Sequence, residues 1–183
     1  SMTLRCIAGV VRPDSGRIVL DGRVLFDSEK GIDLPPQQRN VGLLFQNYAL
    51  FPNMTVEQNI LCALKKEKDP AARKAACGSA LRAMRLEELA HRLPSELSGG
   101  QQQRAALARI LAGRPRILML DEPFSALDSY LREEVEGEVG SLLSHFDGTA
   151  LLVTHDRDEA YRLCREMIVM DSGEVLRAGT TKE

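Results

Sequence analysis

The 183-residue sequence has no tryptophan, little aromatic content and no long apolar run. A membrane-spanning helix needs about 18 consecutive apolar residues, so the sequence predicts no such helix, and no signal peptide is visible. Its four cysteines form no Cys-x-x-Cys pair, and its three histidines do not cluster with them. We therefore expect reduced thiols in a cytoplasmic protein and no zinc site. The net charge of −2 gives no basic signal for nucleic-acid binding.

The order of apolar and polar residues predicts an α/β protein. Residues 117–120 form a continuous apolar run, which is typical of a strand buried on both faces of a parallel sheet. Further strands at 150–154 and 167–170 are expected to alternate with helices after it. Near the start, Asp21-Gly22 predicts a tight turn between two short strands. Strands that alternate with helices favour a doubly wound sheet.

Residues 46 to about 104 read as a helical insertion between these strands. Thr55, followed three residues later by Gln58, is typical of a capping box at the start of a helix. A second helix is expected over about 71–84, and Ser98 is predicted to cap a third that reaches about residue 112.

Two adjacent acidic residues, Asp121 and Glu122, follow the predicted strand 117–120. Ligands bind at the carboxyl ends of strands in open α/β sheets. One of these carboxylates can hold a magnesium ion, while its neighbour polarises an attacking water. The alternative is an ordinary cap or solvated turn, because acidic residues often follow strands.

The run Leu97-Ser98-Gly99-Gly100-Gln101 places a hydroxyl and two glycines at a predicted helix start. Backbone N–H groups without side-chain cover, together with the positive end of the helix dipole, form a ready anion site. The alternative is a serine N-cap whose glycines only permit a turn.

The order of four motifs carries a family resemblance. Residues 97–112 read LSGGQQQRAALARILA, and residues 117–128 read ILMLDEPFSALD. They resemble the signature motif, Walker B strand and D-loop of ATP-binding cassette (ABC) ATPases, in that family's order. Gln46, in a Leu-Phe-Gln run, and His155, in Val-Thr-His-Asp, match its Q-loop glutamine and switch histidine.

The resemblance implies a fold and a division of the chain. The expected fold is a P-loop NTPase (RecA-like) α/β core with an antiparallel β-subdomain and an inserted helical subdomain. Residues 1–45 would form a partial ATP-binding core with the β-hairpin, residues 46–104 the helical signature subdomain, and residues 105–183 the remainder of the core.

The resemblance also implies roles in binding and hydrolysing ATP with Mg²⁺. Asp121 would coordinate the magnesium, and Glu122 would be the general base that activates the attacking water. Gln46 would contact the metal or that water, and His155 would contact the γ-phosphate.

A second ATPase subunit is an expected partner, in a head-to-tail dimer. Ser98, Gly99, Gly100 and Gln101 would cover the nucleotide bound by the other copy, and Asp128 would lie at the same dimer seam. ATP would hold the two subunits together, and hydrolysis would release them.

One part of the family pattern is missing, because no GxxxxGK[ST] phosphate loop occurs in the sequence. Ser1 and Met2 resemble the end of that motif, with Ser1 in the place of the Mg²⁺-binding hydroxyl and Met2 in that of a second threonine. We expect an N-terminal truncation inside this motif, although a cloning remnant at Ser1 is the alternative. The parent protein is then an ATPase, whereas this chain binds ATP weakly or not at all and does not hydrolyse it.

Residues 44–60 resemble the surface of importer ATPases on which a membrane subunit docks. A transmembrane permease is therefore expected to bind residues 46–60, at the cytoplasmic face of the membrane, with a solute-binding protein acting indirectly and no nucleic acid involved. Residues 33–42 look most like molybdate and sulfate importer ATPases, although polyamine, iron and sugar importers share much of this stretch. An exporter or a non-transport regulatory ABC protein remains an alternative. The importer family that this stretch resembles often adds a small regulatory β-domain after the cassette, and residues 179–183 stand where such an extension would begin.

Overall fold

A computed structural model describes residues 1–125, 127 and 129–181. Its helices are α1 (Met2–Ala8), α2 (Pro36–Arg39), α3 (Val56–Ala63), α4 (Pro70–Ala83), α5 (Gly99–Ala112), α6 (Ser129–Ser144) and α7 (Arg157–Leu163), with 3-10 turns at Glu87–Leu89 and Pro94–Glu96. Its strands are β1 (Arg17–Leu20), β2 (Arg23–Asp27), β3 (Ile32–Asp33), β4 (Val41–Leu44), β5 (Ile117–Asp121), β6 (Thr149–Val153), β7 (Glu166–Asp171) and β8 (Glu174–Thr180). None of the described helices is both long enough and apolar enough to cross a membrane.

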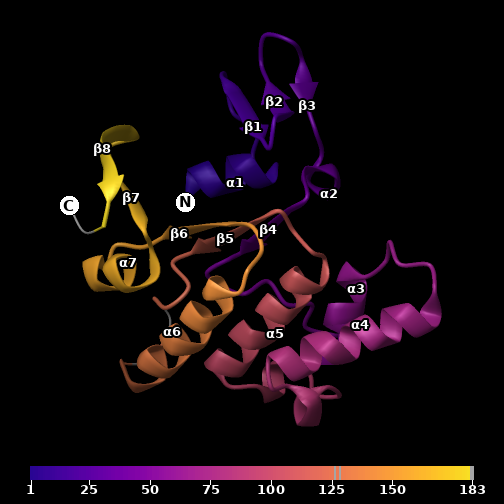
Figure 1. The fold of residues 1–183 in the computed structure, drawn as a ribbon. Coiled ribbons are helices and arrows are strands. Elements are labelled where there is room, and N and C mark those ends of the chain that lie inside the picture. Colours follow the sequence, from indigo (N-terminus) through magenta and orange to yellow (C-terminus); the bar gives the residue numbers. More distant parts are fainter. Residues whose placement is uncertain (126, 128, 182–183) are drawn as a thin grey trace.

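A parallel sheet in the order β4-β5-β6 forms the centre of the molecule (Figure 1). Every residue of β5 is buried, which confirms the strand predicted from the apolar run. Alternate β5 side chains point to opposite faces. Ile117 and Met119 pack with α1, whereas Leu118 and Leu120 pack in the cluster that includes α5 and α6. The continuous apolar run is thus explained by helices on both faces.

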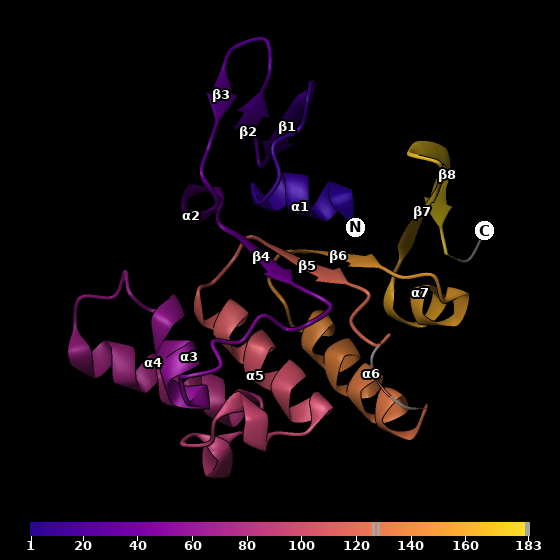
Figure 2. The same ribbon diagram turned by 180° about the vertical axis from the view of Figure 1, so that it is seen from behind.

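The predicted hairpin forms a small antiparallel sheet in the order β1-β2-β3 (Figure 2). Asp21 and Gly22 both adopt positive φ, 49° and 76°, which a two-residue hairpin turn requires. The short strand β3 was not expected from the sequence. Figure 2 shows this sheet beyond α1, on the side away from α5.

The helical lobe of α3, α4 and α5 has a core of its own, which includes Val56, Ile60, Leu81 and Ala105. The predicted capping box is confirmed, since the Thr55 hydroxyl accepts from the backbone N–H of residue 58 and the side chain of that glutamine accepts from the Thr55 N–H.

The last two strands depart from the expected sheet. β7 and β8 pair with each other as a separate two-stranded antiparallel sheet rather than extending the parallel one. The turn at Ser172-Gly173, with φ of 49° and 86°, makes the hairpin local, so the sequence pattern of a strand after a helix did not indicate its partner.

Candidate functional site

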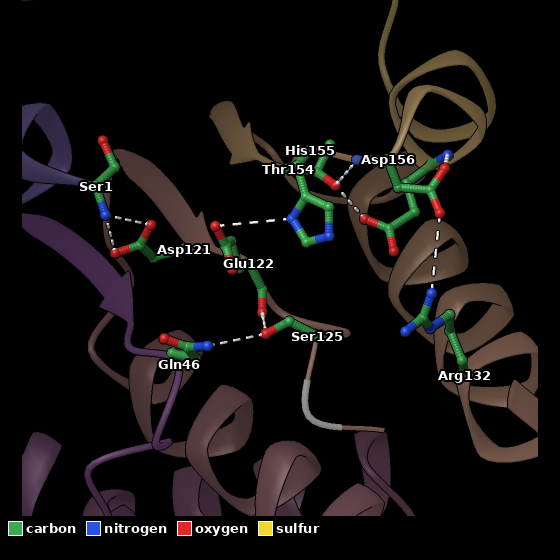
Figure 3. A network of polar contacts seen from close by, with 10 residues as sticks. Ser1, Gln46, Asp121, Glu122, Ser125, Arg132, Thr154, His155 and Asp156 are labelled. Carbon is green, nitrogen blue, oxygen red and sulfur yellow. Dashed lines mark hydrogen bonds and ion pairs between the residues drawn. The ribbon is translucent and has the colours of Figure 1, made fainter. Parts of the chain in front are cut away.

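Four predicted site residues gather at one edge of the parallel sheet (Figure 3). Asp121 ends β5, Gln46 follows β4, and His155 follows β6. Because the carboxyl ends of parallel strands meet at the same edge, the three strands deliver these side chains together. Glu122 comes immediately after Asp121 and completes the group.

Ser1 lies against Asp121. The amino group of Ser1 donates to both carboxylate oxygens of Asp121, whose side chain is only 8% exposed. Ser1 is also the N-cap residue of α1. The two predicted metal-binding residues, Ser1 and Asp121, therefore lie next to each other. Met2, in the first turn of α1, is 65% exposed.

Glu122 has an unusual backbone conformation. Its φ is 49°, in the left-handed region. For a non-glycine residue this conformation costs about 1–3 kcal/mol, and it persists only where the surrounding structure holds it. The Glu122 N–H donates to the Val153 carbonyl at the end of β6 (2.9 Å), which holds the residue in place. This turn directs the carboxylate toward His155, whose Nδ1 lies 3.8 Å from Glu122 Oε1. That distance exceeds a direct hydrogen bond.

Gln46 is linked to Glu122 through Ser125, a residue that sequence reasoning did not single out. The Gln46 side-chain nitrogen donates to Ser125 Oγ (3.2 Å), and that hydroxyl donates to the Glu122 carbonyl (2.9 Å). Figure 3 shows the Gln46 amide oxygen on the side away from Ser125. The linkage orients the glutamine, and only the fold could have revealed it.

A second set of polar contacts fixes the turn that carries His155. Thr154 Oγ1 accepts from the Asp156 N–H (2.9 Å) and donates to the buried Glu159 carboxylate. Asp156 caps α7, and hydrogen bonds from two backbone N–H groups at the start of that helix hold its pKa below the ordinary value. Arg132 of α6 lies 3.9 Å from the same carboxylate. An aspartate just before a predicted helix is a cap signal that could have identified Asp156.

The predicted signature residues form a capping box at the start of α5. Ser98 Oγ accepts from the Gln101 N–H (3.3 Å), and Gln101 Oε1 accepts from the Ser98 N–H (2.9 Å). Gly99 and Gly100 are the first two residues of the helix. Within the residues that the structure describes, no hydrogen bond or ion pair joins Ser98 or Gln101 to the carboxylates at the sheet edge. Asp128 lies outside the described residues.

Comparisons with known proteins agree on one family. The model of the ABC transporter family matches residues 1–125. The spermidine/putrescine import ATP-binding protein PotA of Bacillus thuringiensis is 44% identical over 98% of this chain and 54% of its own length. A probable sulfate/thiosulfate import ATP-binding protein CysA of Chlorella vulgaris is 40% identical over 100% of this chain and 75% of its own length. The chain thus spans about half the length of the PotA relatives that it matches.

Solved structures agree with the sequence comparisons. The ATP-binding cassette MJ0796, in a dimeric post-hydrolysis state bound to ADP and Pi, superposes with a TM-score of 0.79 and 30% identity over 98% of this chain and 79% of its own. CbiO1 of Clostridium perfringens, part of the ABC transporter complex cbiONQ, reaches a TM-score of 0.83 at 26% identity, over 99% of this chain and 72% of its own. The fold is therefore that of a P-loop NTPase cassette, as expected, and the chain belongs to the ABC transporter family.

Proposed function

We propose that the protein is the ATP-binding and ATP-hydrolysing subunit of an ABC importer and powers solute uptake. The main support for this activity is that Asp121, Glu122, Gln46 and His155 gather at one edge of the parallel sheet (Figure 3). The relatives PotA and CysA, both import ATP-binding proteins by name, support the direction of transport.

The residues beside Asp121 fit a magnesium ion. Mg²⁺ takes oxygen ligands, commonly one or two carboxylates plus phosphate and water. Asp121 offers a nearly buried carboxylate oxygen pair at the end of β5. In this proposal the Ser1 hydroxyl and the Gln46 amide oxygen would add further oxygen ligands. Bound there, the ion would neutralise charge on the β- and γ-phosphates.

The neighbouring groups supply the chemistry of hydrolysis. Glu122, whose side chain is 38% exposed, accepts the proton of the attacking water as general base. His155 is 76% exposed and holds the γ-phosphate in line with that water. Gln46, oriented by Ser125, positions the water or the metal. The fixed turn at Glu122 keeps its carboxylate aimed without reorganisation during the reaction.

A second copy of the protein completes the site in this proposal. The N–H groups and hydroxyl at residues Ser98, Gly99, Gly100 and Gln101, with Asp128, would cover the nucleotide held by the partner through Ser1 and Met2. The dimeric state of MJ0796 supports this arrangement. The start of α5, which Ser98 caps, carries the positive end of the helix dipole and is suited to bind the partner's negatively charged γ-phosphate.

The permease is proposed to bind at residues 46–60, which would place the subunit peripherally at the cytoplasmic face of the membrane. A solute-binding protein would act through the permease, and nucleic acid has no part. For the cargo we propose an oxyanion, molybdate or sulfate; the CysA relative, a sulfate/thiosulfate import protein by name, supports sulfate. Polyamine is the second candidate, because PotA proteins match at 44% identity.

Hydrolysis by the full-length protein tests the chemistry. Replacing Glu122 by Gln removes the base and should lower the ATPase rate about 10²–10⁴-fold, whereas Glu174→Gln, on exposed β8, should leave it unchanged. An unchanged rate in Glu122→Gln would refute the assigned role. The 183-residue chain without the GxxxxGK[ST] loop should bind ATP weakly and show no magnesium-dependent hydrolysis.

Reconstitution with the permease tests the cargo. ATPase stimulation by a binding protein loaded with molybdate or sulfate supports the oxyanion, and stimulation by spermidine instead supports the polyamine candidate.

A further inference from the structure

The segment that follows Gln46 turns inward against the signature helix. Tyr48 and Ala49 are consecutive residues with positive φ, 58° and 47°. Two successive left-handed residues are uncommon outside glycine, so contacts elsewhere must hold this turn. Figure 2 shows the segment running from β4 across α5 to α3.

Arg109, near the end of α5, makes those contacts. Its Nη1 donates to the Ala49 carbonyl (2.8 Å), and its Nη2 donates to the Tyr48 carbonyl (3.3 Å). Its guanidinium carbon lies 5.2 Å from the centre of the Phe51 ring, within cation–π range. One side chain of the signature helix therefore contacts three residues of the segment, at positions 48, 49 and 51.

Arg109 is partly buried at these contacts. Burial lowers the pKa of Arg109 from its ordinary value, and a guanidinium remains charged under such conditions. Hydrogen bonds donated by a charged group are stronger than those between neutral groups. Replacing the guanidinium by an apolar side chain would leave both carbonyls without this donor.

Neighbouring residues fasten the same segment to the helical lobe. Asn59 is fully buried in α3 and both accepts from the Phe51 N–H (2.9 Å) and donates to the Phe51 carbonyl (3.2 Å). The buried Tyr48 hydroxyl donates to Gln103 Oε1 on α5 (3.4 Å). Phe51 itself stays 46% exposed. The segment thus presents an aromatic ring outward while its backbone is held by the helix that begins with the signature motif.

We propose that Arg109 is a positioning residue that transmits movement of the docking segment around Phe51 to the signature helix α5. The inference rests on the proposed function, since residues 46–60 are the proposed permease contact. A permease that displaces Phe51 moves the carbonyls held by Arg109, and α5 moves with them as a rigid element. The Ser98–Gln101 end of α5 is thereby advanced toward, or withdrawn from, the partner's nucleotide.

The test measures two rates on the full-length protein: ATPase activity alone, and activity with the permease and its loaded binding protein. Arg109→Met should keep the first rate within about twofold and reduce stimulation about tenfold, in the range of ordinary coupling energies. Arg109→Lys keeps the positive charge but cannot donate to two carbonyls in the planar geometry of a guanidinium, so it should retain part of the stimulation. Arg104→Met is the matched control, because Arg104 is a half-buried arginine of α5 that pairs with Glu138 instead (2.9 Å); it should retain stimulation.

A general structural role predicts a different result. If Arg109→Met lowers both rates equally, or if stimulation stays normal, the inference is overturned. If Arg109→Met does not fold, Phe51→Leu replaces it in the test, because it keeps the apolar surface but removes the ring that contacts Arg109. Normal stimulation of the ATPase rate in Phe51→Leu also overturns the inference. Absence of stimulation in the unmodified protein would instead refute the proposed importer function itself.

Discussion

Gly42 in β4 sets how closely α5 approaches the sheet. A Cβ atom built on Gly42 would lie 2.3 Å from Cγ2 of Ile110 on α5 and 3.2 Å from Cγ of Pro115. Carbon atoms in favourable contact are separated by about 3.5–4.0 Å. The Gly42→Ala variant therefore places a methyl group more than about 1 Å inside contact with Ile110, and either that side chain or the helix must move.

The size of the effect follows from two opposing terms. Overpacking costs about 1–3 kcal/mol, and the depth of this overlap places Gly42→Ala in the upper half, about 2–3 kcal/mol. Replacing glycine by alanine also restricts the unfolded chain, which stabilises by about 0.4–1 kcal/mol. The steric term wins, so the free energy of unfolding should fall by about 1–2.5 kcal/mol.

A second substitution separates the steric cause from other causes. Ile110→Ala removes the colliding Cγ2 atom, and because Ile110 is only partly buried it should cost about 1–3 kcal/mol alone, below the usual range for a core site. In that background Gly42→Ala should be neutral or stabilising, because the new methyl group partly fills the space. The two sites are then coupled by about 1 kcal/mol or more.

Urea unfolding of the four proteins in this cycle measures the coupling. Equal costs of Gly42→Ala with and without Ile110 would refute the argument that close approach of α5 requires glycine. In the full-length protein the same pair should act on ATPase activity, because displacing α5 also displaces the signature residues at its start.

Three further outcomes are expected. Arg39→Met should lower the free energy of unfolding in urea by about 3–5 kcal/mol, because the fully buried guanidinium donates to the Leu34 carbonyl and to two carbonyls at the end of α1, which would lose their donor. Arg12→Met removes only an exposed ion pair with Asp33 (3.7 Å) and should lower it by less than about 1 kcal/mol; equal losses would contradict this. Thr55→Ala should destabilise by about 1 kcal/mol through loss of the α3 cap, and Thr55→Ser should restore most of it in thermal unfolding. The pKa of Asp156 is lowered in the folded protein, so its cap stabilises the fold fully above the unfolded-state pKa and is lost as the pH falls through the lower folded-state value, below about pH 4. In Asp156→Asn the thermal unfolding midpoint should therefore fall less steeply with decreasing pH in this range. An unchanged dependence of the midpoint on pH would count against the cap.

The sequence predicted what depends on local pattern. The apolar run of β5, the Asp21-Gly22 hairpin and the Thr55 and Ser98 caps are each specified within a few residues, and all appear in the structure. Parallel pairing then follows from the α/β pattern and places Asp121 at the correct edge of the sheet.

Contacts between distant residues could not be predicted in this way. Ser125 meets Gln46 across 79 positions, and Arg109 meets Ala49 across 60. The positive φ of Glu122 has no glycine to signal it, because tertiary contacts impose the conformation.

These long-range contacts attach one short segment both to the core and to the helical lobe. Gln46 is bonded to Ser125 on the core side, whereas the carbonyl of Tyr48 is held by Arg109 on α5. Only Asn47 separates these two attachments. A rotation of α5 relative to β5 that preserves both attachments would have to change the backbone angles of residues 46–48, which include the exposed Asn47. Gln46, proposed to position the water or the metal, and Tyr48, held by the helix that begins with the signature motif, are thus separated by Asn47 alone.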